Sequence, residues 1–117
     1  MTDIKRIESG ARMSRAVVYN GVAYLAGMTA AEKTPDIRAQ TRAVLQQIEA
    51  RLAQLGTDKS KLLTAQIWVK DIKNDFAGMN EVWDAWVSPG NAPTRATAQC
   101  PLALPEILVE IIVTAAV

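Results

Sequence analysis

The chain has 117 residues, half of them hydrophobic, and its 13 basic and 12 acidic side chains give a formal net charge of +1. This length predicts one domain over residues 1–117 with a buried core, and the interspersed charges offer no basic surface for nucleic acid. Histidine is absent and Cys100 is the only cysteine. Histidine-based nucleophiles and an intrachain disulfide are therefore excluded, and a metal site is not expected.

The first six residues, Met-Thr-Asp-Ile-Lys-Arg, lack the apolar core of a secretory signal. No apolar run approaches the roughly 20 residues that a membrane-spanning helix needs. A lone cysteine fits a reducing compartment, so we expect a cytoplasmic protein without a membrane partner. Cys100 itself is interpreted as a small, buried residue, with a redox role as the alternative.

Residues 3–8 are consistent with a short polar strand. Two β-rich runs follow, at 16–19 and 22–26, and they flank Asn20-Gly21. Both of these residues tolerate positive φ, so the pair predicts a type I′ hairpin turn. Gly27 ends the second strand, where the backbone turns or lies close to another group.

Residues 36–55 have the hydrophobic spacing of an amphipathic helix. Asp36 is placed to cap its first turn, and Gly56 lies just past its end. The apolar stripe consists of Ile37, Val44, Leu45, Ile48, Leu52 and Leu55. The opposite face is expected to be solvated and carries Arg38, Gln40, Arg42, Gln46, Glu49 and Arg51.

A turn at 58–61 is followed by a mostly buried strand at 62–70 and a second helix. Asn74 or Asp75 is the expected N-cap of this helix, and Pro89-Gly90 stops it. Its apolar stripe contains Phe76, Met79, Val82, Trp83, Trp86 and Val87. We interpret the two tryptophans as large core or interface residues rather than as a ligand platform.

Pro93 is expected to start the next strand, because it has no N–H to give to a ladder. Arg95, Thr97 and Gln99 then share one side, with small alanines on the other. The guanidinium of Arg95 matches a small carboxylate with two parallel hydrogen bonds. An ordinary edge-strand arginine lying over the sheet is the alternative.

After a loop at 101–105, residues 106–117 read as the last strand, so the element order is β-β-β-α-β-α-β-β. This order predicts a two-layer α+β domain with both helices on one face of a single mixed sheet. The last strand is apolar on both sides, with Leu108, Val109, Ile111, Ile112 and Val113. Since the helices can bury only one side, we expect the other to contact a second subunit.

Several segments of the chain resemble the reactive intermediate deaminase (Rid/YjgF) family. These are the helix at 74–86, Ala92-Pro93-Thr94-Arg95, and the closing Val109-Glu110-Ile111, with support from 24–28 and 69–71. The Trp-Asp-Ala-Trp-Val segment at 83–87 is similar to the YoaB-like branch. The resemblance implies a chorismate-mutase-like fold, in which three subunits join their sheets into a central barrel and bind small molecules in the clefts between subunits.

Family members with the full site hydrolyse reactive 2-imino or enamino acids to 2-oxo acids and ammonia without metal or cofactor. The resemblance implies that Arg95 holds the substrate carboxylate and that the backbone amide of Gly27 contacts ligand. Other family positions are altered in this chain. Met13 stands where deaminating members have tyrosine, Ala26 where they have serine, Thr97 where they have cysteine, Ile112 in place of the water-positioning glutamate, and Ala92 in place of an aromatic residue.

Two functions are consistent with a chain that keeps Arg95 and Gly27 but has altered residues at the other family positions. The first is imine or enamine hydrolysis, with Arg95 as the anchor and with Glu110 and Thr97 orienting water. Glu110 matches a family glutamate two residues before Ile112, and by strand parity these two residues share a side. The alternative is a non-catalytic sensor, carrier or chaperone-like trimer that binds a small carboxylate through Arg95. An endoribonuclease role has no support in a chain without histidine or excess positive charge.

Overall fold

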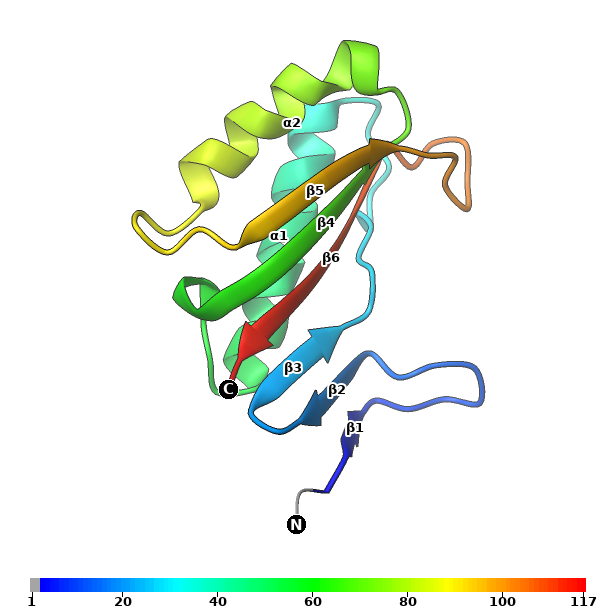
Figure 1. Cartoon of the computed structure of the whole chain (residues 1–117). Coiled ribbons are helices and arrows are strands. Elements are labelled where there is room, and N and C mark those ends of the chain that lie inside the picture. The colour runs from blue at the N-terminus through cyan, green and yellow to red at the C-terminus, as the bar shows by residue number, and fades with distance from the viewer. Residues whose placement is uncertain (1–2) are drawn as a thin grey trace.

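The computed structural model describes residues 3–117 and shows two helices on one face of a single six-stranded sheet (Figure 1). The strand order is β1-β2-β3-β6-β4-β5, and only the β4–β5 pair is parallel. This confirms the predicted α+β class and element order. The elements are β1 (Lys5–Ile7), β2 (Ala16–Tyr19), β3 (Val22–Leu25), α1 (Ile37–Gln54), a 3₁₀ turn (Lys59–Lys61), β4 (Leu62–Val69), α2 (Ile72–Trp86), β5 (Thr94–Gln99) and β6 (Val109–Ala116).

The β2–β3 hairpin turns at Asn20 and Gly21, whose φ angles are 52° and 75°. Both values are positive, as the predicted type I′ turn requires. The first strand was predicted too long: only Lys5–Ile7 pairs with β2. No helix among residues 3–117 is long and apolar enough to cross a membrane.

β6 lies in the middle of the sheet, between β3 and β4. Its alternate side chains Val109, Ile111, Val113 and Ala115 are buried under the helices. The last strand was predicted to begin too early, at 106, and its uncovered face is only partly apolar. The ladder begins only at Val109, and the uncovered face carries Glu110 and Thr114 beside Ile112 and Ala116. A hydrogen bond of 2.7 Å joins the hydroxyls of Thr114 and Thr64 on that face.

The first helix starts as predicted, because the carboxylate of Asp36 accepts a 3.1 Å hydrogen bond from the Arg38 amide. Gly56, at φ 78°, follows its end. The expected solvated face was wrong at two positions. Gln40 is fully buried, since its amide holds three backbone groups, and the side chain of Arg51 is only 15% exposed.

Helix α2 begins earlier than predicted, and its cap is Asp71 rather than Asn74 or Asp75. The Asp71 carboxylate accepts hydrogen bonds from the backbone and side-chain amides of Asn74, at 3.3 and 2.7 Å. The first N–H of the helix, on Ile72, donates to the side-chain oxygen of Gln99 at 3.0 Å. Because strand β5 supplies this acceptor, the helix can start directly after β4.

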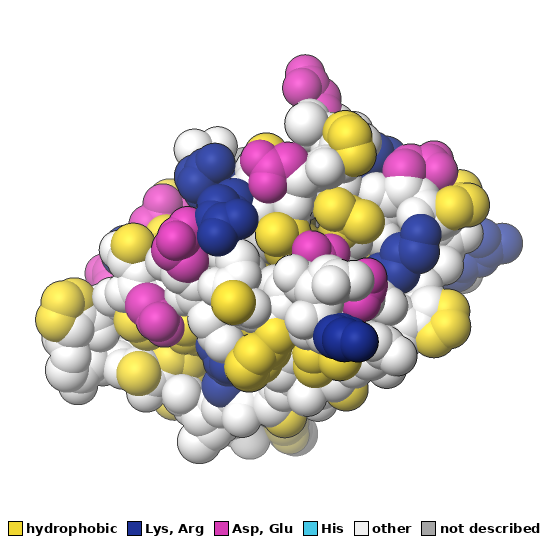
Figure 2. All heavy atoms as spheres, turned by 90° about the horizontal axis from the view of Figure 1, so that it is seen from above, with side chains coloured by type: hydrophobic (Ala, Val, Ile, Leu, Met, Phe, Trp, Pro, Cys, Tyr) yellow, Lys and Arg dark blue, Asp and Glu magenta, His cyan; other side chains and the backbone are white. Residues whose placement is uncertain are grey.

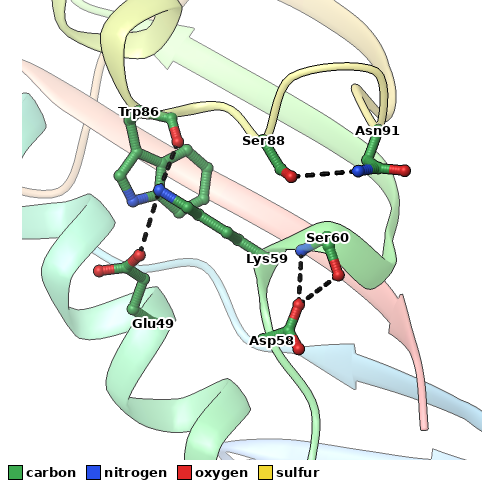
Figure 3. A network of polar contacts seen from close by, with 7 residues as sticks. All are labelled: Glu49, Asp58, Lys59, Ser60, Trp86, Ser88 and Asn91. Atoms are coloured by element: carbon green, nitrogen blue, oxygen red, sulfur yellow. Dashed lines mark hydrogen bonds and ion pairs between the residues drawn. The ribbon is translucent and has the colours of Figure 1, made fainter.

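The other end of α2 is held by Lys59 (Figure 3). The ammonium donates to the Trp86 carbonyl at 2.6 Å and lies 3.5 Å from Glu49 on α1 and 5.2 Å from the Trp86 ring centroid. A cation at a helix C-terminus is favourable, because it meets carbonyls that have no partner within the helix. The Trp83 ring lies 5.5 Å from that of Trp86 and is 5% exposed, which confirms its predicted place in the core.

Candidate functional site

Three of the positions singled out by the resemblance meet on the uncovered face of the sheet. Gly27 lies beside β6, and a Cβ built on it would be 2.1 Å from Glu110 Oε2 and 3.2 Å from Ile112 Cγ1. The Glu110 carboxylate therefore occupies the space that a side chain at position 27 would need. We call Gly27, Glu110 and Ile112 the Gly27 cluster.

Burial raises the pKa of the Glu110 carboxyl. The group stands half-buried between its strand neighbours, so ionisation costs more than it does in water. A carboxyl of this kind keeps its proton to a higher pH than a free glutamate. It is therefore suited to donate a proton to a leaving nitrogen as well as to orient water.

Arg95 lies elsewhere, on the helix-covered side of β5. It is paired in register with the buried Ala65, and its guanidinium carbon is 5.6 Å from the centroid of the Trp83 ring. This cation–π contact agrees with the alternative interpretation of an arginine lying over the sheet edge. Arg95 is nevertheless exposed, because β5 is an edge strand.

The rest of the polar row on β5 has separate roles. The side-chain oxygen of Gln99 accepts a hydrogen bond from the first turn of α2. The Thr97 hydroxyl is buried and has no hydrogen-bond partner within residues 3–117. Cys100, which follows β5, is half-buried, and its thiol donates to the Pro101 carbonyl at 3.1 Å. The Thr97 hydroxyl therefore keeps its hydrogen-bonding capacity.

A single chain does not bring Arg95 to the Gly27 cluster. Strands β6 and β4 separate β3 from β5, which corresponds to roughly 14 Å at about 4.8 Å per strand step. Arg95 and Glu110 also point to opposite faces, since their register partners Ala65 and Trp68 alternate along β4. A site that contains both groups has to be built from two chains.

The two remaining predicted residues are Met13 and Ala26. Met13 is 45% exposed in the loop between β1 and β2, where its carbonyl accepts a 2.8 Å hydrogen bond from Gly10. The Ala26 amide donates to the Arg15 carbonyl at 2.9 Å. These contacts are made by the backbone, so neither side chain contributes a polar group to the site.

A cavity of about 390 Å³ opens beside Ala26 and Gly27, against one side of α1. The sequence did not indicate this cavity. Its two basic lining residues are Arg15, which lies in a loop, and Arg51, which lies on a helix face that was expected to be solvated. Among residues 3–117 no three His, Cys, Asp or Glu side chains gather to hold a metal ion.

Comparison with known proteins agrees with this fold and these motifs. A family model described as Endoribonuclease L-PSP matches residues 3–117. A crystal structure of a YjgF-family member from Neisseria meningitidis is 43% identical, covers 97% of this chain and 94% of that one, and superposes with a TM-score of 0.93. The chain belongs to the Rid/YjgF family.

Curated relatives refine this assignment. The RutC family protein YoaB of Escherichia coli K12 is 45% identical over 114 residues, which is 97% of this chain and 98% of the relative. A RutC family protein of Haemophilus ducreyi is 42% identical over 114 residues, 97% of each. The predicted YoaB-like branch is confirmed.

Proposed function

We propose that the protein hydrolyses small reactive 2-imino or enamino acids to 2-oxo acids and ammonia, without a cofactor, at clefts between the subunits of a homotrimer. The observation that carries the proposal is the Gly27 cluster, in which a carboxyl of raised pKa lies against the glycine expected to bind ligand through its amide. The Gly27 N–H has no backbone acceptor within residues 3–117, so it is available to a carboxylate.

The second chain supplies the anchor. In one subunit Arg95 is exposed at the sheet edge and faces away from Glu110, so a neighbouring subunit has to bring its own Arg95 to the Gly27 cluster. The uncovered sheet face with Ile112 and Tyr24 is the surface we propose for this assembly, because it exposes apolar side chains that a monomer leaves in water.

The chemistry needs few groups. Water adds to the carbon of the C=N bond, and the resulting carbinolamine loses ammonia to give the 2-oxo acid. Ionised Glu110 orients the water and accepts its proton as the C–O bond forms, and the protonated carboxyl then gives that proton to the departing nitrogen. Arg95 and the Gly27 amide hold the substrate carboxylate, so that the reacting carbon stays beside Glu110.

A non-catalytic carboxylate binder is the second candidate. It is favoured by the residues at three positions, since Met13, Ala26 and Ile112 offer no polar side chain where deaminating relatives carry one. A ribonuclease role gains no such support. Figure 2 shows acidic and basic side chains interspersed on the face seen from above, and phosphate binding relies on clustered positive charge.

The test generates 2-iminopropionate in place with an amino-acid oxidase and measures how much the protein accelerates pyruvate formation. We expect Arg95→Ala to lower kcat/KM by about 10²-fold and Arg95→Lys to retain part of it, because lysine keeps the charge but not the bidentate geometry. Glu110→Gln is expected to lower kcat with a smaller change in KM. Arg42→Ala, which removes an exposed arginine of α1, is the matched control.

The outcomes separate the two candidates. Acceleration that survives in Arg95→Ala at the parent level contradicts the proposed anchor. No acceleration by an intact oligomer rejects hydrolysis of this substrate. Pyruvate that raises the melting temperature of such an inactive protein, but not that of Arg95→Ala, would then identify a binder.

A further inference from the structure

The cavity beside α1 has the chemistry of an anion site. It is lined by Arg15, Arg51, Gln54 and the backbone of Gly27, and no lining residue is acidic. Gln47 on α1 donates a 2.9 Å hydrogen bond to the Thr29 carbonyl, which ties the segment after β3 to the helix. The cavity is therefore built by two elements that are fixed to each other.

Arg51 is held in position before any ligand arrives. Its side chain is 15% exposed, and its Nη1 donates to the Gln54 side-chain oxygen at 2.9 Å. The same nitrogen forms an ion pair with Glu8, in the segment that follows β1. Since a guanidinium has five N–H donors in a fixed fork, this arginine is pre-organised for a carboxylate.

Glu8 itself stands where a ligand carboxylate would bind. Arg51, and more weakly Arg15, lower the pKa of its carboxyl, so both guanidinium groups act on this one anion. The Glu8 side chain is 58% exposed, and its backbone has φ 48°, a left-handed conformation unusual for glutamate. Because Glu8 is the exposed partner of this pair, an incoming anion can replace its carboxylate at Arg51.

We propose that Arg51 and Arg15 bind a second carboxylate of the ligand, so that the preferred ligands are small dicarboxylic 2-imino or 2-oxo acids. The inference rests on the proposed function for the first carboxylate, which binds at the amide of Gly27; this glycine lines the cavity and also contacts Glu110. Glu8 is the internal competitor that fills this second position in the free protein. At about 390 Å³ the cavity falls in the usual range for small-molecule sites.

Binding of two 2-oxo acids tests the proposal without requiring turnover. 2-Oxoglutarate carries a second carboxylate and 2-oxobutyrate does not, and their dissociation constants are compared by calorimetry on the intact protein. We expect 2-oxoglutarate to bind about tenfold more tightly in the parent, as one added charge-assisted contact allows. Arg51→Gln should remove this difference, Arg15→Gln should reduce it, and Arg42→Gln should leave it unchanged.

Glu8→Gln gives the sharper readout. If Glu8 competes with ligand, its neutralisation tightens 2-oxoglutarate binding and leaves 2-oxobutyrate binding unchanged, an effect that a merely structural ion pair would not produce. Equal affinities of the two acids in the parent, or an equal loss for both acids in Arg51→Gln, would overturn the proposal. If the protein binds 2-oxoglutarate more tightly than 2-oxobutyrate but accelerates no imine hydrolysis, the proposed reaction alone is refuted. If it accelerates imine hydrolysis but binds the two acids equally, the second carboxylate site alone is refuted.

Discussion

Replacing Gly27 with alanine probes the contact on which the candidate site depends. The added Cβ would lie 2.1 Å from Glu110 Oε2, 3.1 Å from its Cδ and 3.2 Å from Ile112 Cγ1. The carboxylate has to move by roughly 1 Å or more to restore van der Waals contact. Glu110 can move because it is the end of a flexible side chain, whereas Ile112 is fixed in the central strand.

The magnitude follows from two opposing effects. Over-packing of this kind costs about 1–3 kcal/mol. Alanine also restricts the unfolded chain, which returns about 0.4–1 kcal/mol where the backbone is not in a left-handed conformation. We therefore expect Gly27→Ala to lower the free energy of unfolding by about 0.5–2 kcal/mol. The rate of imine hydrolysis should also fall, because the displaced carboxyl no longer faces the Gly27 amide.

A double-mutant cycle with Glu110→Ala isolates the contact. Urea unfolding at a fixed protein concentration gives the free energy for each variant, so that any oligomer contributes equally. In the Glu110→Ala background the carboxylate is gone, and Gly27→Ala should cost clearly less than in the parent. Costs that agree within about 0.5 kcal/mol in the two backgrounds would show that Glu110 does not occupy this space in solution.

Gln40→Leu should lower the free energy of unfolding by about 1–3 kcal/mol in the same assay, because it leaves part-buried backbone groups of Thr34, Glu106 and Leu108 without their partner. The exposed Gln46→Leu serves as control, and equal effects would refute the role of Gln40. For Glu110, a folded pKa above the unfolded value means that the folded state binds more protons. The stability that this group contributes to the protein is therefore lost as the pH rises from the unfolded pKa through the folded pKa. The melting temperature of Glu110→Gln should therefore rise relative to that of the parent as the pH increases above about 4, and a difference that does not depend on pH would contradict the raised pKa.

Local chemistry explains what the sequence made predictable. Asn20-Gly21, Asp36 and Gly56 act on backbone groups within a few residues, and the structure places them as expected. The second cap was mispredicted although its own contacts are local, since the Asp71 carboxylate accepts from Asn74 three residues on. The distant contact is a different one: Gln99 accepts a hydrogen bond from the first N–H of α2 across 27 residues. The spacing of hydrophobic residues around Asn74 does not indicate the hydrogen bond between Ile72 and Gln99.

The candidate site was predictable only in part, for the same reason. Strand parity correctly placed Glu110 on the same side as Ile112, but it gave no sign that Arg95 faces the other side of the sheet. That follows from the register of β5 on β4. Gln40 and Arg51 looked like solvated helix residues, since hydrophobic spacing cannot show that a loop or the Glu8 segment covers a polar side chain.

The place of β6 has a consequence for how the chain is made. The hairpin of β2 and β3 meets β4 and β5 only through β6, whose Ala116 pairs with Val22 in a contact that spans most of the sequence. A nascent chain that has left the ribosome up to the loop after β5 therefore holds two half-sheets with no ladder between them. Each half exposes an edge that β6 later covers, and such edges recruit other strands. Folding of the sheet has to wait for β6, so slow translation before it would prolong the stage most open to aggregation.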